Sequence, residues 1–321
     1  MADPIGVVLL NLGGPDTLAD VEPFLVNLFS DRRIIRLSPF PFLQGFIARR
    51  IARKRAPKSQ EAYRLIGGGS PLRRITGEQG RALEVVLGEA GRFVSAMAMR
   101  YWRPRADETL AALAAQGIHR VVALTLYPHY SVATTGSSLE DLCQAAARIG
   151  GMEIAEVRQW PDQPDYVAAL AGTISEGLAG FGGEPVQVVY SAHSLPKKFI
   201  DEGDPYLDHI RCTIGAVEGL TGTVGRLCFQ SRSGPVEWLA PSTPEMLGQL
   251  AQEGVRNVLM VPISFVSDHV ETLYEIDIQY QELATSLGMR LSRTAALNTR
   301  PEFIQGLAKL VLAACRDKGW I

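Results

Sequence analysis

The sequence predicts an α/β protein of two Rossmann-like lobes, each a small parallel sheet flanked by helices, with a cleft between them. Its 321 residues exceed one ordinary domain, and a hydrophobic share of 46% can fill two cores. Short apolar runs, typical of strands buried on both faces, alternate with helical patterns. The helix-to-strand junction at residues 117–121 is similar to that at 254–258, which favours two lobes of one plan. We place the lobes at residues 1–172 and 173–321, with the last helix a candidate to pack back on the first lobe.

Composition excludes several classes of function. A formal net charge of −2 gives no general attraction to nucleic acid or to an anionic surface. The 4 cysteines are far apart and form no CxxC pair, which argues against a zinc knuckle or disulfide framework and suits a reducing compartment. Residues 1–30 lack the pattern of a signal peptide, and no apolar run approaches the roughly 20 residues that span a bilayer. We therefore expect a cytoplasmic protein with no nucleic-acid partner.

The first lobe begins with a continuous apolar run at residues 5–10, which predicts a buried strand. The loop at residues 11–15 follows it, and because neither G-x-G-x-x-G nor the P-loop pattern occurs there, we exclude nucleotide phosphate binding. Three glycines at residues 67–69 could let the backbone approach a ligand or form an anion-binding nest, or could mark a flexible loop. Further helices are predicted at residues 76–87, at 107–116 and from 139, and further strands at 93–99, 121–126 and 154–158. The hydroxyl-rich stretch before residue 139 suits an N-cap at Ser137 or Ser138.

Residues 32–58 carry the strongest local charge bias, with Arg and Lys but no acid, and with interleaved Phe, Leu and Ile. Pro39 and Pro41 prevent one long helix, but residues 43–55 could form a basic amphipathic helix. Three interpretations stay open. In order of preference, they are a surface helix with its apolar residues on the core, an interfacial helix at a membrane, and a nucleic-acid patch.

A helix at residues 166–178 leads to the second lobe, where residues 186–190 predict another buried strand. Pro196 prevents a simple continuation, so His193 lies just past the carboxyl end of a parallel strand. Ligands bind at that edge of open α/β sheets. A loop histidine bonded to backbone is the alternative, but the rigid surroundings of this imidazole favour a functional role.

A strand at residues 258–263 precedes a helix that we expect to begin at Asp268. Glu271 and Glu275 are four residues apart, so they share one helix face, and Gln279 continues the row. One interpretation is ordinary capping by Asp268 with a solvated acidic face. The other is a wall of carboxylates at the end of a strand, facing His193 across the cleft. The last helix, at residues 302–314, is interpreted as packing.

Several motifs closely resemble those of the ferrochelatases. Ser191-Ala192-His193-Ser194-Leu195-Pro196, followed by Gly203-Asp204-Pro205-Tyr206, is similar to the signature of that family. Residues 60–64 with the glycines and Ser70, and the Gln-Ser-x-x-Gly-Pro-x-x-Trp-Leu segment at 230–239, resemble the family as well. The resemblance implies a lyase that inserts ferrous iron into protoporphyrin IX in the last step of haem synthesis, with iron as a substrate.

By this resemblance, His193 and Glu271 form the catalytic pair and also serve as metal ligands. Asp268 and His269 support them, and Glu275 extends a proton or metal path. The chemistry suits these residue types, because metallation removes two pyrrole protons while it delivers a divalent ion, and imidazole and carboxylates can accept protons or bind iron. We expect the imidazole and the acid on opposite sides of an apolar slot that holds a bent macrocycle.

The resemblance also implies a set of porphyrin contacts in the first lobe. They are Leu12, Tyr63, Ser70, Arg100, Tyr127 and Ser131. Arg100 would meet a propionate, although a surface ion pair is the simpler interpretation of its pattern alone. Residues 34–47 would form a mobile lip with peripheral membrane contact. Val132 stands where some members of the family carry a cluster-ligating cysteine, so we expect no iron–sulfur cluster.

Two other functions stay open. One is a chelatase that prefers coproporphyrin, or cobalt or zinc, since the chain does not reveal the ring's side-chain pattern. The other is a protein that binds a tetrapyrrole without turnover. The pair of His193 and Glu271 separates the classes, because a carrier needs neither residue.

Overall fold

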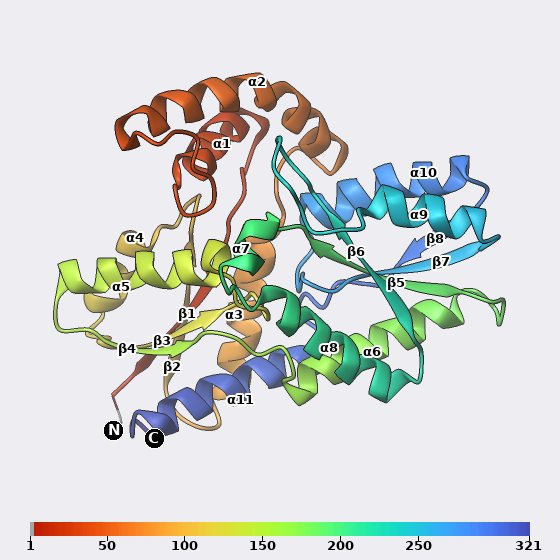
Figure 1. Cartoon of the computed structure of the whole chain (residues 1–321). Helices are drawn as coiled ribbons and strands as arrows, with labels where there is room; N and C mark the ends of the chain where they lie inside the picture. Colours follow the sequence, from red (N-terminus) through yellow and green to blue (C-terminus); the bar gives the residue numbers. More distant parts are fainter. Residues whose placement is uncertain (1–2) are drawn as a thin grey trace. The chain divides into compact units, whose positions relative to one another are not determined.

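We describe the protein from a computed structural model that defines residues 3–321. The chain forms two compact units. The first unit comprises the residues through Gln159 together with Ile304–Ile321, and the second unit comprises Trp160–Phe303. Within the described residues, each unit holds a four-stranded parallel sheet with helices on both faces (Figure 1).

The first unit carries the N-terminal elements. Its strands are β1 (Ile5–Asn11), β2 (Phe93–Met99), β3 (Arg120–Thr125) and β4 (Glu153–Val157). Its helices are η1 (Leu18–Asp20), α1 (Val21–Ser30), η2 (Pro41–Leu43), α2 (Gln44–Leu65), α3 (Leu72–Leu87), α4 (Ala106–Ala114), η3 (Val132–Gly136) and α5 (Ser137–Ile149). The elements η1 and η2 are 3-10 turns, and η3 is a π-helical turn.

The second unit follows the same plan. Its strands are β5 (Gln187–His193), β6 (Gly225–Gln230), β7 (Asn257–Pro262) and β8 (Arg290–Arg293). Its helices are α6 (Pro164–Ala179), α7 (Lys197–Asp201), α8 (Tyr206–Thr221), α9 (Thr243–Gln252), the π-helix η4 (Glu271–Tyr280) and α10 (Gln281–Ser286). The last helix, α11 (Pro301–Asp317), starts at the end of the second unit and continues into the first.

The two sheets have the same strand connectivity. It is β2-β1-β3-β4 in the first unit and β6-β5-β7-β8 in the second, and all neighbours are parallel. Each sheet therefore ends its strands at a single carboxyl edge, which is where open α/β sheets bind ligands. The predicted fold class, two Rossmann-like sheets with flanking helices, is confirmed.

Apolar residues on each sheet pack against the helices that cover it. In the first unit, Val8 and Val121 pack with Leu110 of α4 and Leu142 of α5, all fully buried. In the second unit, a buried apolar cluster joins strands β5 and β7 to the helices α9, η4 and α10. Figure 1 shows α9 and α10 on one face of that sheet and α6 and α8 on the other. Burial of these continuous apolar strands is the main favourable term that holds each sheet and its helices together.

Several element boundaries differ from the sequence-based expectations. Helix α2 does not end at residue 55 but continues through Pro57 to Leu65. Strand β5 runs three residues further than expected, because β6 continues beside it and His193 pairs with Gln230. The hydroxyl that caps the turn before α5 belongs to Ser131, not to Ser137 or Ser138. The short strand β8 and helix α8 were not predicted.

Candidate active site

His193 is the last residue of β5, at the carboxyl edge of the second sheet. Its backbone N–H donates to Ser264 Oγ at 3.0 Å, and its carbonyl accepts from the Tyr206 hydroxyl at 3.0 Å. Phe265 approaches the imidazole edge-on, with 6.5 Å between the ring centroids. The backbone of His193 is therefore held from two sides, while its side chain stays 38% exposed.

The imidazole of His193 contacts the carboxylate of Glu271, with 2.7 Å between Nδ1 and Oε2. Glu271 is the first residue of η4, and its side chain is 17% exposed. Because an ionised carboxylate only accepts hydrogen bonds, Nδ1 carries the proton, and Nε2 of the neutral ring keeps its lone pair. The pair therefore offers a base or metal ligand whose ring orientation is set by an acid.

This contact corrects one expectation from the sequence. The imidazole and the acid do not face each other across a slot, because at 2.7 Å no macrocycle fits between them. The reason is the strand order: β5 and β7 are neighbours in one sheet, so the end of β5 and the segment after β7 meet at the same edge. A substrate can meet the pair only from its exposed side.

A second acid lies behind Glu271. Ser231 Oγ is 2.8 Å from Glu271 Oε2 and 2.7 Å from Glu275 Oε2. Gln230 Nε2 donates to Glu275 Oε2 at 3.2 Å and to the carbonyl of Glu271 at 3.0 Å. The structure thus brings the two predicted acids together. It also adds Ser231 and Gln230, which the sequence analysis quoted as a family-like segment without giving them a role.

The three titratable groups shift one another. The pKa of Glu275 is raised to about 7 by burial and by the negative charge of Glu271. Burial opposes ionisation of Glu271 as well, but the adjacent His193 and the Ser231 hydroxyl hold its pKa below the ordinary value. Burial lowers the pKa of His193, yet the charge and hydrogen bond of Glu271 raise it by more, so the net shift is upward. Below about pH 7, Glu275 is therefore protonated while Glu271 is ionised. The Glu275 carboxyl can then donate a hydrogen bond to Ser231 Oγ, and the Ser231 hydroxyl can donate to Glu271.

His269 adds a second neutral imidazole beside the pair. Its Nδ1 lies 3.0 Å from the carbonyl oxygen of Ser267, and since a carbonyl only accepts, Nδ1 carries the proton here too. Its ring packs against Phe265 at 4.4 Å between centroids. Burial lowers the pKa of His269, which favours the neutral ring.

The acids stand on a π-helix rather than on the α-helix that we expected. The element η4 begins at Glu271, its N-cap is Val270, and no side chain caps it, so Asp268 is not the cap. Turns of this kind, with backbone bonding from i to i+5, are frequent at functional sites. Glu271 and Glu275 of this π-helix share the Ser231 hydroxyl.

Asp268 has different partners from the other acids. Its Oδ1 lies 3.1 Å from Arg293 Nη1 and 3.2 Å from Thr272 Oγ1, and its Oδ2 accepts from Asn298 Nδ2 at 2.8 Å. Both carboxylate oxygens are therefore engaged.

In the first unit, four of the six predicted porphyrin contacts follow strands of the sheet, whereas Tyr63 and Ser70 do not. Leu12 comes directly after β1, and its carbonyl accepts from the Tyr101 N–H at 2.9 Å. The Ser70 N–H donates to the carbonyl of Pro15 at 2.8 Å, and a Cβ at Gly69 would overlap the carbonyl of Asp16. The glycine-rich loop is thus packed against the loop after β1, and the absence of a side chain at Gly69 is needed for that approach. Tyr63 lies buried on α2.

Arg100 follows β2, and its guanidinium is surrounded by acids. Nη2 lies 2.8 Å from Asp31 Oδ2, Nη1 lies 3.3 Å from Asp141 Oδ1, and Nε donates to Ser137 Oγ at 2.7 Å. The Tyr101 hydroxyl also donates to Asp31, at 2.8 Å. The ion-pair interpretation of Arg100 therefore describes its contacts within this unit, although the pairs are largely buried rather than on the surface.

Tyr127 and Ser131 follow β3. The Tyr127 N–H donates to Thr125 Oγ1 at 3.2 Å, and burial raises the pKa of the Tyr127 hydroxyl well above its usual range. Ser131 is fully buried, and its hydroxyl accepts from the N–H of Ala133 at 3.2 Å. The carboxyl edge of this one sheet therefore carries four of the predicted contacts, Leu12, Arg100, Tyr127 and Ser131. Ser70 lies against the loop that follows β1 at the same edge.

The predicted metal ligands are His193 and Glu271. Among residues 3–321, no group of three or more His, Cys, Asp or Glu side chains is placed to enclose an ion. Nε2 of His193 is an imidazole donor and the carboxylate of Glu271 is an oxygen donor, and both donor types suit a divalent first-row metal. Their contact through Nδ1 places the carboxylate on the opposite side of the ring from Nε2.

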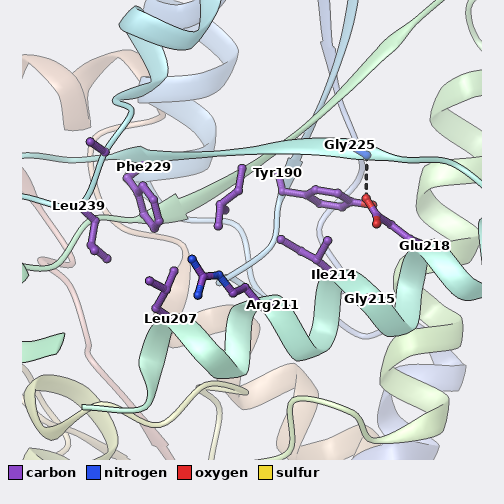
Figure 2. Close-up of a pocket in the computed structure, with 11 residues that line it drawn as sticks. Tyr190, Leu207, Arg211, Ile214, Gly215, Glu218, Gly225, Phe229 and Leu239 are labelled. Atoms are coloured by element: carbon purple, nitrogen blue, oxygen red, sulfur yellow. Dashed lines mark hydrogen bonds between the residues drawn. The ribbon is translucent and has the colours of Figure 1, made fainter. Parts of the chain in front are cut away.

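A concavity of about 430 Å³ lies between α8, β5 and β6, and none of its lining residues is among the predicted site residues (Figure 2). Figure 2 shows the Arg211 side chain reaching from α8 between Leu207 and Ile214 toward the strands. The walls of the concavity combine apolar side chains with the charged side chains of Arg211 and Glu218, and the aliphatic stem of an arginine can cover the apolar part.

Sequence comparison matches a model of the ferrochelatase family over residues 4–315. Similar proteins include a ferrochelatase of Desulfotalea psychrophila, 58% identical over 310 residues that cover 96% of this chain and 97% of that protein. A ferrochelatase of Geotalea uraniireducens is 55% identical over 315 residues, covering 97% and 98%.

Comparison of structures shows the same fold at low sequence identity. SirB from Bacillus subtilis, solved with Fe3+, superposes with a TM-score of 0.58 at 12% identity over 99% of this chain and 98% of that one. CbiX, described as the terminal enzyme for sirohaem biosynthesis in denitrifying bacteria, gives 0.52 at 11% identity over 96% and 99%. Fold and site thus define an α/β protein of two Rossmann-like units with a histidine–glutamate pair at the carboxyl edge of one sheet. The family match is specific: the chain belongs to the ferrochelatase family, and the resemblance seen in the sequence is confirmed.

None of the helices within residues 3–321 combines the length and the apolar character needed to cross a membrane.

Proposed function

We propose that the protein inserts ferrous iron into protoporphyrin IX to give protohaem, as a metal chelatase of the lyase class. Membership of the ferrochelatase family supports iron insertion into a porphyrin. The observation that carries the mechanism is the contact of His193 Nδ1 with Glu271 Oε2 at 2.7 Å, with the imidazole partly exposed. Ferrous iron is a substrate of this reaction, held only in passing.

Two pyrrole protons must leave as two nitrogen–iron bonds form, and the site offers two acceptors. Nε2 of His193 takes one proton, and the imidazolium that results is stabilised by Glu271. The second proton reaches Glu275 through Ser231 when Glu275 is ionised. Before transfer, Nε2 of His193 holds the iron, while the Glu271 carboxylate on the Nδ1 side of the ring keeps the imidazole in place. The apolar ring faces supply the binding energy that offsets bending of the macrocycle. His269, held neutral by burial, supports the pair.

We assign ring contacts in the first unit to Leu12, Tyr63, Ser70, Tyr127 and Ser131. Arg100 is the exception among the residues that the resemblance indicated. Asp31 and Asp141 already balance its charge, so a propionate there would add a third negative group to one guanidinium. We infer that Arg100 mainly anchors the segment that contains Asp31.

The experiment is anaerobic incubation of the purified protein with ferrous iron and protoporphyrin IX, followed through the loss of the free-base absorption bands. Coproporphyrin, and cobalt or zinc in place of iron, are run in parallel. Turnover of protoporphyrin faster than of coproporphyrin supports the proposal. Preference for coproporphyrin would replace the substrate, and binding without metal insertion would indicate a tetrapyrrole carrier.

We infer that residues 34–47 make peripheral contact with a membrane. Phe40, Phe42 and Phe46 are 58%, 78% and 61% exposed, whereas the buried face of α2 is formed largely by alanines. This speaks against the surface-helix interpretation, in which the apolar residues pack on the core. Exposed aromatic side chains next to the basic residues of α2 suit an interface with anionic lipid.

We also propose that the protein carries no iron–sulfur cluster. Val132 occupies the position at which some members of the family have a cysteine, and its side chain has no ligating atom. Iron and acid-labile sulfide analysis of freshly purified protein tests this, and stoichiometric sulfide would contradict it.

A further inference from the structure

Arg293, the last residue of β8, binds acids on both sides of Glu271 along the chain. Its Nε and Nη2 lie 2.7 Å and 2.8 Å from the two carboxylate oxygens of Asp277, inside η4. Its Nη1 lies 3.1 Å from Asp268 Oδ1, three residues before η4 begins. The side chain of Arg293 is only 12% exposed. One guanidinium therefore ties the segment before the π-helix to the π-helix itself.

Asn298 completes this connection. Its Nδ2 donates to Asp268 Oδ2 at 2.8 Å, and its Oδ1 accepts from the Asp268 N–H at 3.0 Å. Asn298 has a φ of 42°, a left-handed conformation that asparagine tolerates better than most residues. Arg293 and Asn298 together engage every carboxylate oxygen of Asp268, so Asp268 acts as an anchor point rather than as a free acid.

The segment between the two anchors carries the functional groups. His269 follows Asp268 directly, and Glu271 and Glu275 both lie between Asp268 and Asp277. A π-helix has less favourable backbone hydrogen bonding than an α-helix and persists where other contacts hold it. The guanidinium is planar and presents its donors in a fixed fork, so it can hold two carboxylates at a set separation, which a lysine does not reproduce.

We propose that Arg293 is a positioning residue of the chelatase reaction, which holds η4 in register so that Glu271 meets His193. The expected loss of kcat rests on the proposed function, whereas the expected change in the contact between Glu271 and His193 does not. The simpler alternative is that Arg293 only stabilises the fold, because its removal leaves two partly buried carboxylates without their cation.

The test compares Arg293→Met and Arg293→Lys with Arg300→Met. Arg300 is a matched control: it makes a bidentate pair with Glu176, at 3.0 Å and 2.6 Å, and contacts Glu302, and neither of these acids belongs to η4. The readouts are the melting temperature, kcat for iron insertion, and the NMR resonance of the His193 Nδ1–H, which reports its 2.7 Å contact with Glu271.

We expect Arg293→Met to shift or broaden the His193 resonance and to lower kcat by about 10- to 100-fold at a temperature where the protein stays folded. Arg293→Lys should have a melting temperature close to that of the wild type but a clearly lower kcat. Arg300→Met should lower the melting temperature and leave both the resonance and kcat close to wild type. If Arg293→Met fails to fold, Arg293→Lys and Asp277→Asn carry the same test.

An unchanged His193 resonance in folded Arg293 variants would overturn the positioning role, and so would a kcat that falls only as stability falls, as in the Arg300 control. If the wild type inserts no iron, the proposed function fails, but the resonance still decides whether Arg293 positions Glu271.

Discussion

His193 Nδ1 lies 2.7 Å from Glu271 Oε2, although the two residues are 78 positions apart in the chain. The contact arises because β5 and β7 are adjacent strands that end at one sheet edge. It sets the tautomer of the imidazole, leaves Nε2 as the reactive nitrogen, and lowers the pKa of the acid while raising that of the base. The predictions below follow from this pair and from the groups that support it.

Glu271→Gln should lower the pKa of His193. The charge and hydrogen bond of Glu271 raise that pKa, and without them the lowering effect of burial exceeds the smaller raising effect of the Glu275 charge. The midpoint of the His193 titration, followed by NMR of the ring, should fall below the wild-type value and below the ordinary value of about 6.5. Glu176→Gln, which removes an acid paired with Arg300, should leave the midpoint unchanged. A His193 midpoint that stays raised in Glu271→Gln would show that another group controls it.

Glu275→Gln should change how stability depends on pH. The folded carboxyl keeps its proton to a pKa of about 7, against an ordinary value of 4.5, so the native state binds more protons than the unfolded state between these values. The free energy of unfolding of the wild type therefore falls as pH rises through that window. The amide lacks this cost, so the variant should gain roughly 1–3 kcal/mol relative to wild type between pH 5 and 8. Parallel stability curves for the two proteins in urea at each pH would rule this out.

Ser231→Ala should slow proton removal without weakening porphyrin binding. Its hydroxyl is the link between Glu271 and Glu275, at 2.8 Å and 2.7 Å. We expect kcat to fall by about tenfold while KM for the porphyrin stays near wild type. The loss should be less than additive with Glu275→Gln, since both changes interrupt one path. Ser175→Ala on the exposed side of α6 is the control, and an additive double variant would argue against a shared path.

Phe42→Ser combined with Phe46→Ser should reduce binding to anionic vesicles. Both rings are exposed, at 78% and 61%, and lie beside the basic residues of α2. Co-sedimentation with phosphatidylcholine vesicles that contain phosphatidylglycerol should drop by about tenfold or more, because two aromatic anchors are lost. Val85→Ser removes a residue that is 77% exposed on α3 and should have no effect. Equal sedimentation of all three proteins would remove the membrane contact.

Helices and strands were predictable where the local hydrophobic pattern matches the burial of the residues in the structure. The apolar runs of β1, β3 and β7 are buried at nearly every position, and the sequence pattern alone identifies them. Strand β8 was missed because Arg290 and Arg293 interrupt its apolar character. Those arginines are accommodated by tertiary partners, which a local pattern does not reveal.

The candidate site was predictable in its residues but not in its geometry. Motifs indicated His193 and Glu271, and the spacing of Glu271 and Glu275 placed both acids on one face. Direct contact of the imidazole with the acid follows from the strand order, which the sequence does not display. The π-helix was missed because its residues read equally well as an α-helix, and Arg293 was missed because its partners lie 16 and 25 positions away.

The most direct test of the account is kcat for ferrous insertion into protoporphyrin IX by His193→Ala, with His119→Ala, an exposed histidine, as control. We predict a fall of about 100- to 10,000-fold for His193→Ala, at a melting temperature close to wild type, because base and metal ligand are lost together. His119→Ala should match the wild type. Iron insertion by His193→Ala at the wild-type rate would contradict the assignment of the reaction to the His193 and Glu271 pair.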